Sequence, residues 1–222
     1  MKLLKIRISG LVVIAAVFLL LVAGNGELIR EGIELLEADR LEEARQKFLN
    51  VLETEPDDER ALYYLSQVAH RSDERREAFK YFDRLARREP GDFEHFKARE
   101  VYQFTGILAH QIGEYSRAIE LLEKAQSEAE SETVYQRLEG WRQRARAAHL
   151  RQLGKQREER LENLLRQSKQ YLERGNTRQA LNLLLEHRDE FEEIPRFSSQ
   201  INTLRRRLEV EEWREQSTDI DR

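Results

Sequence analysis

The sequence predicts an all-α protein, a solenoid of antiparallel helix pairs, and three observations support this prediction. Charged residues make up 36% and hydrophobic residues 40% of the 222 positions, with only three prolines, a composition that favours helices. No stretch shows the sustained alternation of apolar and polar residues that marks a half-buried strand. A fixed period typical of stacked helical repeats is also present. An alanine, a phenylalanine and a proline recur after 34 residues, as Ala44, Phe48, Pro56 and then Ala78, Phe82, Pro90.

The stretch from Gly32 to Pro90 resembles the tetratricopeptide repeat (TPR) family. In that family each unit is a helix, a turn and a second helix, with a small residue where the two helices touch and Ala and Phe on the second helix. Gly32 stands twelve residues before Ala44, and Ser66 twelve before Ala78, as the family pattern requires. The resemblance implies a helical stack whose activity is the binding of other proteins.

This resemblance divides residues 27–130 into three TPR units. Repeat one covers residues 27–56 and turns near Asp39, where the family's glycine is absent but aspartate tolerates the turn geometry. Repeat two covers residues 57–90, and we expect Ser72–Asp73 to form its turn.

Repeat three, residues 91–130, is longer than the other two. Its alanine, Ala118, comes 40 rather than 34 residues after its counterpart in repeat two, and the six additional residues precede Gly106. We therefore expect the first helix of this unit to begin nearly two turns early, at about 1.5 Å per residue. Phe93 and Phe96 lie on this extension and are expected to cover the edge of repeat two, with contact to a ligand as the alternative.

After residue 130 the pattern changes to that of one Arg-rich helix over residues 131–160. Its apolar seam has spacings of 4, 3, 4 and 3: Val134, Leu138, Trp141, Ala145 and Ala148. Either Gly154 interrupts the helix or it continues to Glu173. We expect a structural helix with a solvated charged face. The alternative is a basic docking face for an acidic partner or anionic lipid headgroups, formed by Arg144, Arg151 and Arg157.

Residues 161–217 predict a divergent TPR-like pair and a capping helix, followed by a tail at residues 218–222. The positions that match a repeat are Leu164, Tyr171, Gly175, Ala180 and Leu184. His187 stands at a position that is small in the family, and the expected proline does not follow. Ile194–Pro195 breaks the chain before a last helix, residues 198–215, whose polar outer face lets a stack end in water. Its apolar residues are Ile201, Leu204, Leu208 and Trp213.

Residues 1–24 have the pattern of a targeting segment. The three positive residues Lys2, Lys5 and Arg7 precede the apolar run Leu11–Ala23, which fits either a cleaved signal peptide or an uncleaved membrane anchor; a buried helix is the third option. The positive flank predicts that the body lies on the extracytoplasmic side, which is the periplasm in a bacterium. Without these three charges the net charge changes from −4 to −7, unlike a nucleic-acid-binding protein.

No motif predicts catalysis. The chain has no cysteine, and it has no glycine-rich phosphate loop, no nucleophile–base pattern and no histidine spacing of a metal site. We therefore expect no enzymatic activity, no cofactor, no metal and no small-molecule substrate.

The TPR resemblance implies that the first helices of successive units line a concave groove that holds protein partners. The groove positions of repeats two and three are Tyr63, Gln67, His70, Arg71, Gln103, Ile107 and His110. Tyr63 is the expected anchor, because aromatic side chains dominate binding energy. His70 and His110 hold equivalent positions, and we expect partner contacts there because two histidines are too few for a metal site. In repeat one the corresponding positions are Ile29, Ile33 and Leu36, of which the last two are expected to pack between helices.

One specialised TPR function is excluded by the groove residues. TPR domains that hold a chaperone's C-terminal carboxylate do so with Lys, Asn and Arg at set positions. Those positions here are Ile29, Ile33, Tyr64, Glu100 and Phe104. A mixed apolar and aromatic groove suits an amphipathic helix or an extended segment instead.

The sequence therefore predicts an extracytoplasmic TPR adaptor or scaffold that binds other proteins in the assembly of a membrane or envelope complex. A self-associating structural component, joined through the long helix and the C-terminal pair, is the alternative. A nucleic-acid-binding repeat protein that uses the Arg-rich helix is a third reading, against which export from the cytoplasm argues.

Overall fold

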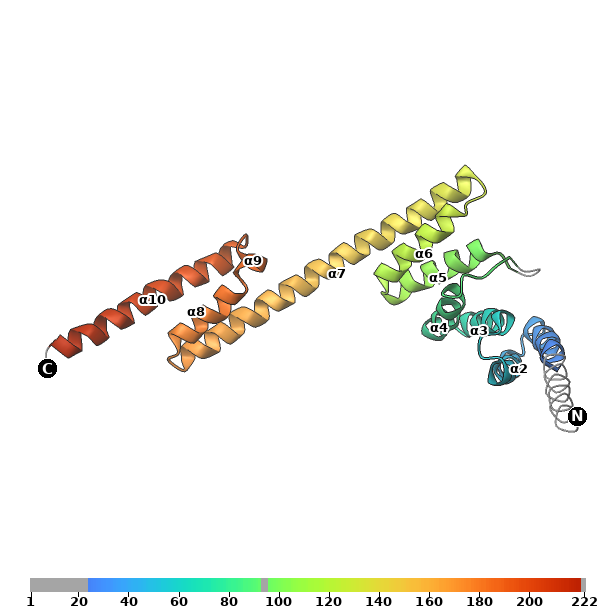
Figure 1. Cartoon of the computed structure of the whole chain (residues 1–222), viewed down its shortest axis with the longest axis horizontal. Coiled ribbons are helices and arrows are strands. Elements are labelled where there is room, and N and C mark those ends of the chain that lie inside the picture. The colour runs from blue at the N-terminus through green and yellow to red at the C-terminus, as the bar shows by residue number, and fades with distance from the viewer. Residues whose placement is uncertain (1–23, 93–95, 221–222) are drawn as a thin grey trace, which may run out of the picture. The chain divides into compact units, whose positions relative to one another are not determined.

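A computed structural model describes residues 24–92 and 96–220, which form helices joined by turns and loops, with no β-strand in either range (Figure 1). The all-α prediction is confirmed. The predicted signal or anchor segment and Phe93 lie outside the described residues, apart from Gly24. Within the described ranges, no helix combines the length and the apolar character needed to cross a membrane. The chain forms two compact units that divide between His149 and Leu150, called unit 1 and unit 2 below.

Unit 1 consists of successive antiparallel helices, each packed against the next. After a helix that includes residues 24–37 come α2 (Leu41–Thr54), α3 (Glu59–Arg71), α4 (Arg75–Ala86), α5 (Ala98–Ile112), α6 (Tyr115–Ser127) and the first part of α7 (Glu132–Glu173). These helices form the TPR-like pairs that the 34-residue period predicts.

The small residues at the helix crossings are required by close contact. A Cβ atom on Gly32 would lie 2.5 Å from Cε1 of Phe48, and one on Gly106 would lie 2.8 Å from Cγ of Leu122. Ser66, at the same position of repeat two, is fully buried, and its hydroxyl donates a hydrogen bond to the carbonyl of Tyr63. The crossings of repeats one and three therefore have no room even for a Cβ atom, whereas that of repeat two holds a serine.

The turns within the repeats use the left-handed backbone conformation. Its φ is 57° at both Asp39 and Asp73, and 90° at Gly113 in repeat three. Aspartate is one of the few residues with a side chain that visits this region readily. The expected turns, near Asp39 in repeat one and at Ser72–Asp73 in repeat two, are confirmed.

The prediction that the first helix of repeat three begins early is wrong. α5 begins at Ala98, eight residues before Gly106, much as α3 begins seven residues before Ser66. The backbone of Lys97 is extended, and the Asp92 carboxylate accepts a hydrogen bond from the Ala98 N–H at 2.9 Å. This bond caps the helix at Ala98, so the additional residues precede the helix instead of lengthening it.

The apolar seam of the Arg-rich segment packs onto repeat three. Leu138 and Ala145 are fully buried in the core cluster that also contains Ala118, and Trp141 packs against that cluster. Gly154 does not interrupt the helix, since α7 continues from Glu132 to Glu173. The segment predicted as a helix over residues 131–160 is thus the first part of α7.

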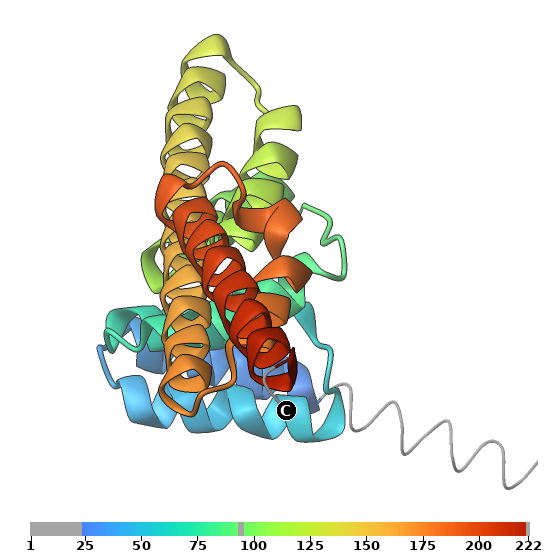
Figure 2. The ribbon, with the colours of Figure 1, turned by 90° about the vertical axis from the view of Figure 1, so that its left-hand side faces the viewer.

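Unit 2 contains the rest of α7, then α8 (Thr177–Glu186), α9 (Arg188–Phe191) and α10 (Pro195–Ile220). α10 packs along α8 (Figure 2), and the predicted pair residues Leu164, Ala180 and Leu184 share one core cluster. Ser168, twelve residues before Ala180, is fully buried, with its hydroxyl 3.4 Å from the Ala180 carbonyl oxygen. It is the small crossing residue of this pair, which the sequence analysis missed.

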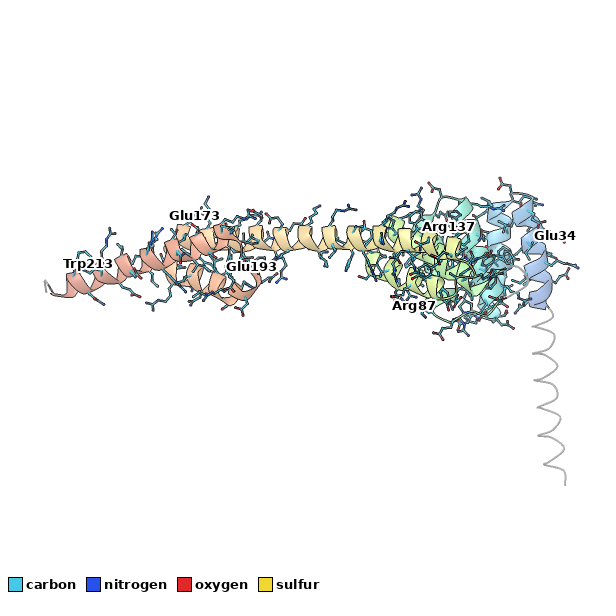
Figure 3. The ribbon with its side chains drawn as sticks, turned by 90° about the horizontal axis from the view of Figure 1, so that it is seen from above. Glu34, Arg87, Arg137, Glu173, Glu193 and Trp213 are labelled. Atoms are coloured by element: carbon cyan, nitrogen blue, oxygen red, sulfur yellow. The ribbon has the colours of Figure 1, made fainter. Side chains whose placement is uncertain are left out.

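The end of unit 2 differs from the prediction in three ways. α10 begins at Pro195 rather than residue 198, because proline suits the first helical position, where its missing N–H is not needed. Phe191 and Phe197, not considered as core residues, are fully buried with ring centroids 5.6 Å apart. Trp213 is 67% exposed (Figure 3), unlike Ile201 on the same helix, which is buried.

Candidate partner-binding groove

The predicted groove residues lie on α3 and α5, the first helices of repeats two and three. His70 and Arg71 are exposed, whereas Tyr63, Gln67 and the three predicted residues of α5 are half-buried. Both helices pack against α4, so one rigid scaffold holds the two sets of side chains.

Tyr63 is tied into the stack by aromatic contacts. Its ring stacks on that of Phe96, with centroids 4.4 Å apart, and meets Phe82 and Tyr64 edge-on at 6.0 and 5.3 Å. Burial and the nearby Glu100 carboxylate raise the pKa of Tyr63, partly offset by its hydrogen bond with Gln67. Phe96 is 3% exposed, which confirms that it covers repeat two. Truncation of Tyr63 would therefore disturb the stack as well as the groove.

Phe104 is the exposed aromatic residue of this surface. It is 45% exposed, and its ring stacks on buried Phe82 at a centroid distance of 6.4 Å and an interplanar angle of 18°. Phe104 adjoins Gln103 in sequence and lies one turn from Ile107 on α5. In the sequence, Phe104 stands out only as one of the positions where the carboxylate-clamp residues are absent. Ile107 was the available signal, because residues three apart on a helix lie on the same face.

Other predicted groove residues have structural contacts. The Arg71 guanidinium donates a hydrogen bond to the Leu36 carbonyl at 2.9 Å, and the same carbonyl accepts one from the Asp39 N–H at 3.2 Å. His110 lies against Trp141 and Tyr115, with ring centroids 5.9 and 5.6 Å away. No group of His, Cys, Asp or Glu side chains in the described ranges could hold a metal ion.

In repeat one the structure leaves little of the predicted groove surface. Ile29 and Leu36 are both buried in the core cluster of α2 and α3, and Ile33 packs against it. The expectation was right for Leu36 and Ile33 but wrong for Ile29, which also packs between helices. Apart from Ile33, the predicted groove residues that keep exposed surface therefore belong to repeats two and three.

The three arginines of the predicted basic face have different surroundings. Arg144, in unit 1, lies 5.0 Å above the Trp141 ring. In unit 2, Arg157 donates a hydrogen bond to the Glu190 carbonyl and lies over the Phe191 ring at 5.7 Å. Arg151 is exposed, and it precedes Arg157 by six residues, which is about 240° around a helix. Arg151 and Arg157 therefore project from different sides of α7.

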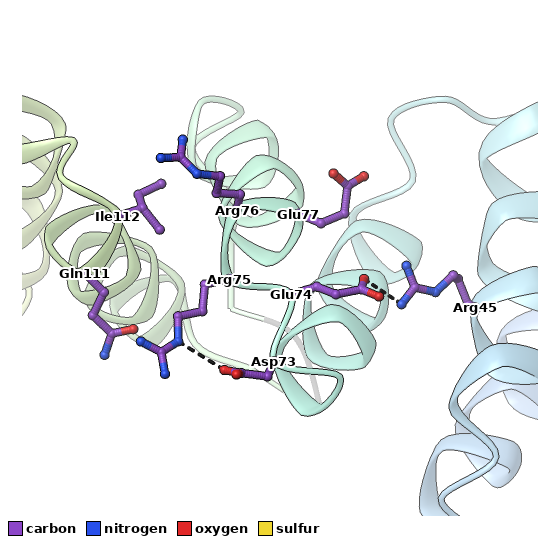
Figure 4. Close-up of a pocket in the computed structure, with 8 residues that line it drawn as sticks. All are labelled: Arg45, Asp73, Glu74, Arg75, Arg76, Glu77, Gln111 and Ile112. Carbon is purple, nitrogen blue, oxygen red and sulfur yellow. Dashed lines mark hydrogen bonds and ion pairs between the residues drawn. The ribbon is translucent and has the colours of Figure 1, made fainter.

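A hollow of about 790 Å³ lies beside α2, α4 and the end of α5 (Figure 4). Its charged lining residues are three arginines and three carboxylates: Arg45, Arg75, Arg76, Asp73, Glu74 and Glu77. Arg45 bonds Glu74 at 2.7 Å, and Arg75 bonds Asp73 at 3.1 Å. Because these charges largely neutralise one another, the hollow does not select a ligand of either sign.

No protein-family model matches this chain, and no curated protein matches it. Among solved structures, it is similar to the P58(IPK) TPR domain, at 16% identity and a TM-score of 0.48, over 85% of this chain and 57% of that one. It is similar to MamA at 14% identity and a TM-score of 0.44, over 82% of this chain and 80% of MamA. It is also similar to YrrB, described as a TPR protein with an unusual peptide-binding site. The identity is 16% and the TM-score 0.44, over 79% of this chain and 90% of YrrB. Likeness at this level carries no argument about what the chain binds. The TPR-like assignment rests on its own helix pairs.

Proposed function

We propose that this TPR-like chain is an extracytoplasmic scaffold that binds other proteins through the groove surface of α3 and α5, in the assembly of a membrane or envelope complex. The observation that carries the binding proposal is Phe104. A half-exposed aromatic ring on a helix has a large apolar surface to offer, and aromatic residues dominate binding energy.

The contacts of Phe104 favour a partner over a purely structural role. Buried Phe82 supports one face of the ring, which limits its motion and lowers the entropy lost on binding. Gln103 and Ile107 add a polar and an apolar neighbour on the same helix. This mixture suits an amphipathic helix or an extended segment, in which apolar anchors alternate with hydrogen-bonding groups.

The extracytoplasmic location rests on the N-terminal sequence, where positive charge precedes the apolar run. A reporter that is active only outside the cytoplasm, fused after Arg222, should be active. Transfer of the positive charge of Lys2, Lys5 and Arg7 to positions beyond Gly24 should reduce that activity. Activity of a cytoplasm-only reporter at the same site would contradict the extracytoplasmic location. It would also make the nucleic-acid-binding alternative viable again.

Phe104→Ala tests the groove. The variant should lose the partners that the wild-type full chain captures by cross-linking in native membranes, because a hot spot contributes at least about 2 kcal/mol, roughly thirtyfold in affinity. Tyr135→Ala is the matched control, since Tyr135 is 41% exposed in the same unit but lies on α7. Partners should be identified by mass spectrometry and compared between the two variants.

Two results would contradict the proposal. If Phe104→Ala keeps every partner while charge reversal at Arg144 releases them, the binding surface is α7 rather than the groove. If the wild-type protein captures only further copies of itself, the chain is the self-associating structural component.

A further inference from the structure

Two turns of α7 at the start of unit 2 carry apolar side chains without cover. Leu150 is 68% and Leu153 47% exposed, and every residue from 151 to 160 is exposed. Leucine side chains placed this far into solvent on neighbouring turns form a surface that can be buried by a partner.

This surface continues the packing face of unit 2. Residues at spacings of 4, 3, 4, 3 and 4 form a single stripe along α7: Leu150, Gly154, Arg157, Leu161, Leu164 and Ser168. From Leu161 onward the stripe is buried in the core cluster that α8 and α10 complete. Its first two turns therefore extend an established helix-packing face beyond the helices that cover it.

Gly154 lies in the middle of the uncovered turns. A Cβ atom there would meet nothing within 4 Å, in contrast to Gly32 and Gly106. Glycine weakens a helix interior, and no contact with the rest of the described chain requires it here. A second helix crossing at Gly154 would gain the close approach that a missing side chain permits.

The charge beside the stripe selects the kind of helix. No aspartate or glutamate lies between Glu139 and Glu158, so every charged side chain on the turns between them is positive. Arg151 forms no ion pair within the described residues, and Lys155 has only Glu159, at 3.8 Å. Because successive residues are about 100° apart around a helix, Arg151 and Lys155 lie on one side of the two leucines. Carboxylates on an incoming helix would find these cations along that side.

We propose that Leu150, Leu153 and Gly154, with Arg151 and Lys155 along one side of them, bind an acidic amphipathic helix of a partner protein. An antiparallel second copy centred on the two leucines would instead bring these cations together. An anionic membrane is disfavoured because the next turn carries Glu158 and Glu159, which repel it. The proposal concerns unit 2 and does not depend on the groove of unit 1.

The test uses the purified full chain and a fluorescent synthetic helix of about 21 residues, with Leu at heptad positions a and d and Glu at e and g. A peptide with Lys in place of every Glu is its charge control. Fluorescence anisotropy should show saturable binding of the acidic peptide, weakened by salt, and at least about tenfold weaker binding of the basic peptide.

Three variants locate the site. Leu150→Ser with Leu153→Ser should weaken binding of the acidic peptide at least about tenfold without a change of charge. The matched control is Val210→Ser, because Val210 is 48% exposed on α10 of the same unit; binding should stay within about twofold. Gly154→Ala should also weaken binding although it strengthens the helix, a combination that a merely solvated α7 would not give.

Three results would contradict the proposal, and two of them would identify another occupant. Equal loss in the leucine double variant and in Val210→Ser, or unchanged binding in both, would overturn the proposal. Stronger binding to vesicles with anionic lipid than to the acidic peptide, lost in the leucine double variant, would assign the surface to a membrane. Sedimentation of the wild-type chain as a dimer that the leucine double variant dissociates would assign it to a second copy.

Discussion

Repeat two of unit 1 and the helix pair of unit 2 cross in the same way but end differently. Each has a fully buried serine, Ser66 or Ser168, twelve residues before a fully buried alanine, Ala78 or Ala180. Repeat two closes at a proline, whereas unit 2 continues into α9 and the buried pair of Phe191 and Phe197. The crossing of two helices thus demands small residues, while the closure of the pair can be built from different side chains.

The largest expected effect tests whether the two crossings are independent. Ala78→Arg should unfold unit 1 and Ala180→Arg unit 2, because helix axes about 8–10 Å apart leave no room for a guanidinium and a buried unpaired charge costs about 3–5 kcal/mol. Hydrogen exchange measured by mass spectrometry should show lost protection in only the substituted unit. Loss in both units from either change would show that they fold as one.

A second comparison uses two ion pairs with the same sequence separation. Asp83 and Arg117 are 2.6 Å apart with mostly buried side chains, whereas Arg178 and Glu212 are 2.8 Å apart and exposed. Burial lowers the pKa of Arg117, but hydrogen bonds to Glu120 and Asp83 raise it by more, so the net shift is upward and the guanidinium stays charged. Asp83→Ala should therefore cost about 3 kcal/mol.

Glu212→Ala should cost less than about 1 kcal/mol, since solvent screens an exposed pair. Urea titrations at low and high salt would measure both effects, with tryptophan fluorescence for unit 1 and hydrogen exchange for unit 2. Equal costs for the two changes would show that burial does not decide the strength of these links.

Substitution of alanine for a glycine should change stability in opposite directions in the two units. Gly106→Ala should destabilise unit 1 by about 2 kcal/mol, because its methyl group would meet Leu122. Gly154→Ala should stabilise α7 by about 0.5–1 kcal/mol, since that position is open. Trp141 reports on unit 1 in a Trp213→Phe background, and hydrogen exchange reports on α7. Stabilisation by Gly106→Ala would contradict the close crossing.

The smallest expected effect concerns the turns. Asp73→Gly should stabilise repeat two by about 0.5–1 kcal/mol, because glycine adopts the left-handed conformation without the strain of a side chain. Gly113→Asp should destabilise repeat three by a similar amount. Thermal unfolding followed by Trp141 fluorescence would measure both, and a loss of stability in Asp73→Gly would mean that the aspartate side chain contributes more than its strain costs.

The 34-residue period predicted the helix crossings because each crossing depends on residues within a single repeat. Gly32 with Phe48, and the turn at Asp73, are local consequences of the 34-residue pattern. The start of α5 was missed because a side chain six residues away, Asp92, caps it. Helix periodicity alone contains no information about such a cap.

The candidate site was predicted only in part for a similar reason. The repeat register correctly placed Tyr63 on α3 and Ile107 on α5. Which of these side chains stay exposed depends on the residues that the loops pack against them. Phe96 is 33 residues from Tyr63 and covers it, whereas Phe104 keeps nearly half of its surface open. The closing pair Phe191 and Phe197 was missed because it replaces the family's proline with unrelated residues.

The seam of α7 has a consequence for the order of events during translation. The core of unit 1 is completed only when Leu138, Trp141 and Ala145 cover repeat three. From the end of α6 at Ser127 to the end of the seam at Ala148 the ribosome must add 21 residues (148 − 127), which takes about 1–4 s at roughly 5–20 residues per second. For those seconds α5 and α6 lack the cover that the seam of α7 provides.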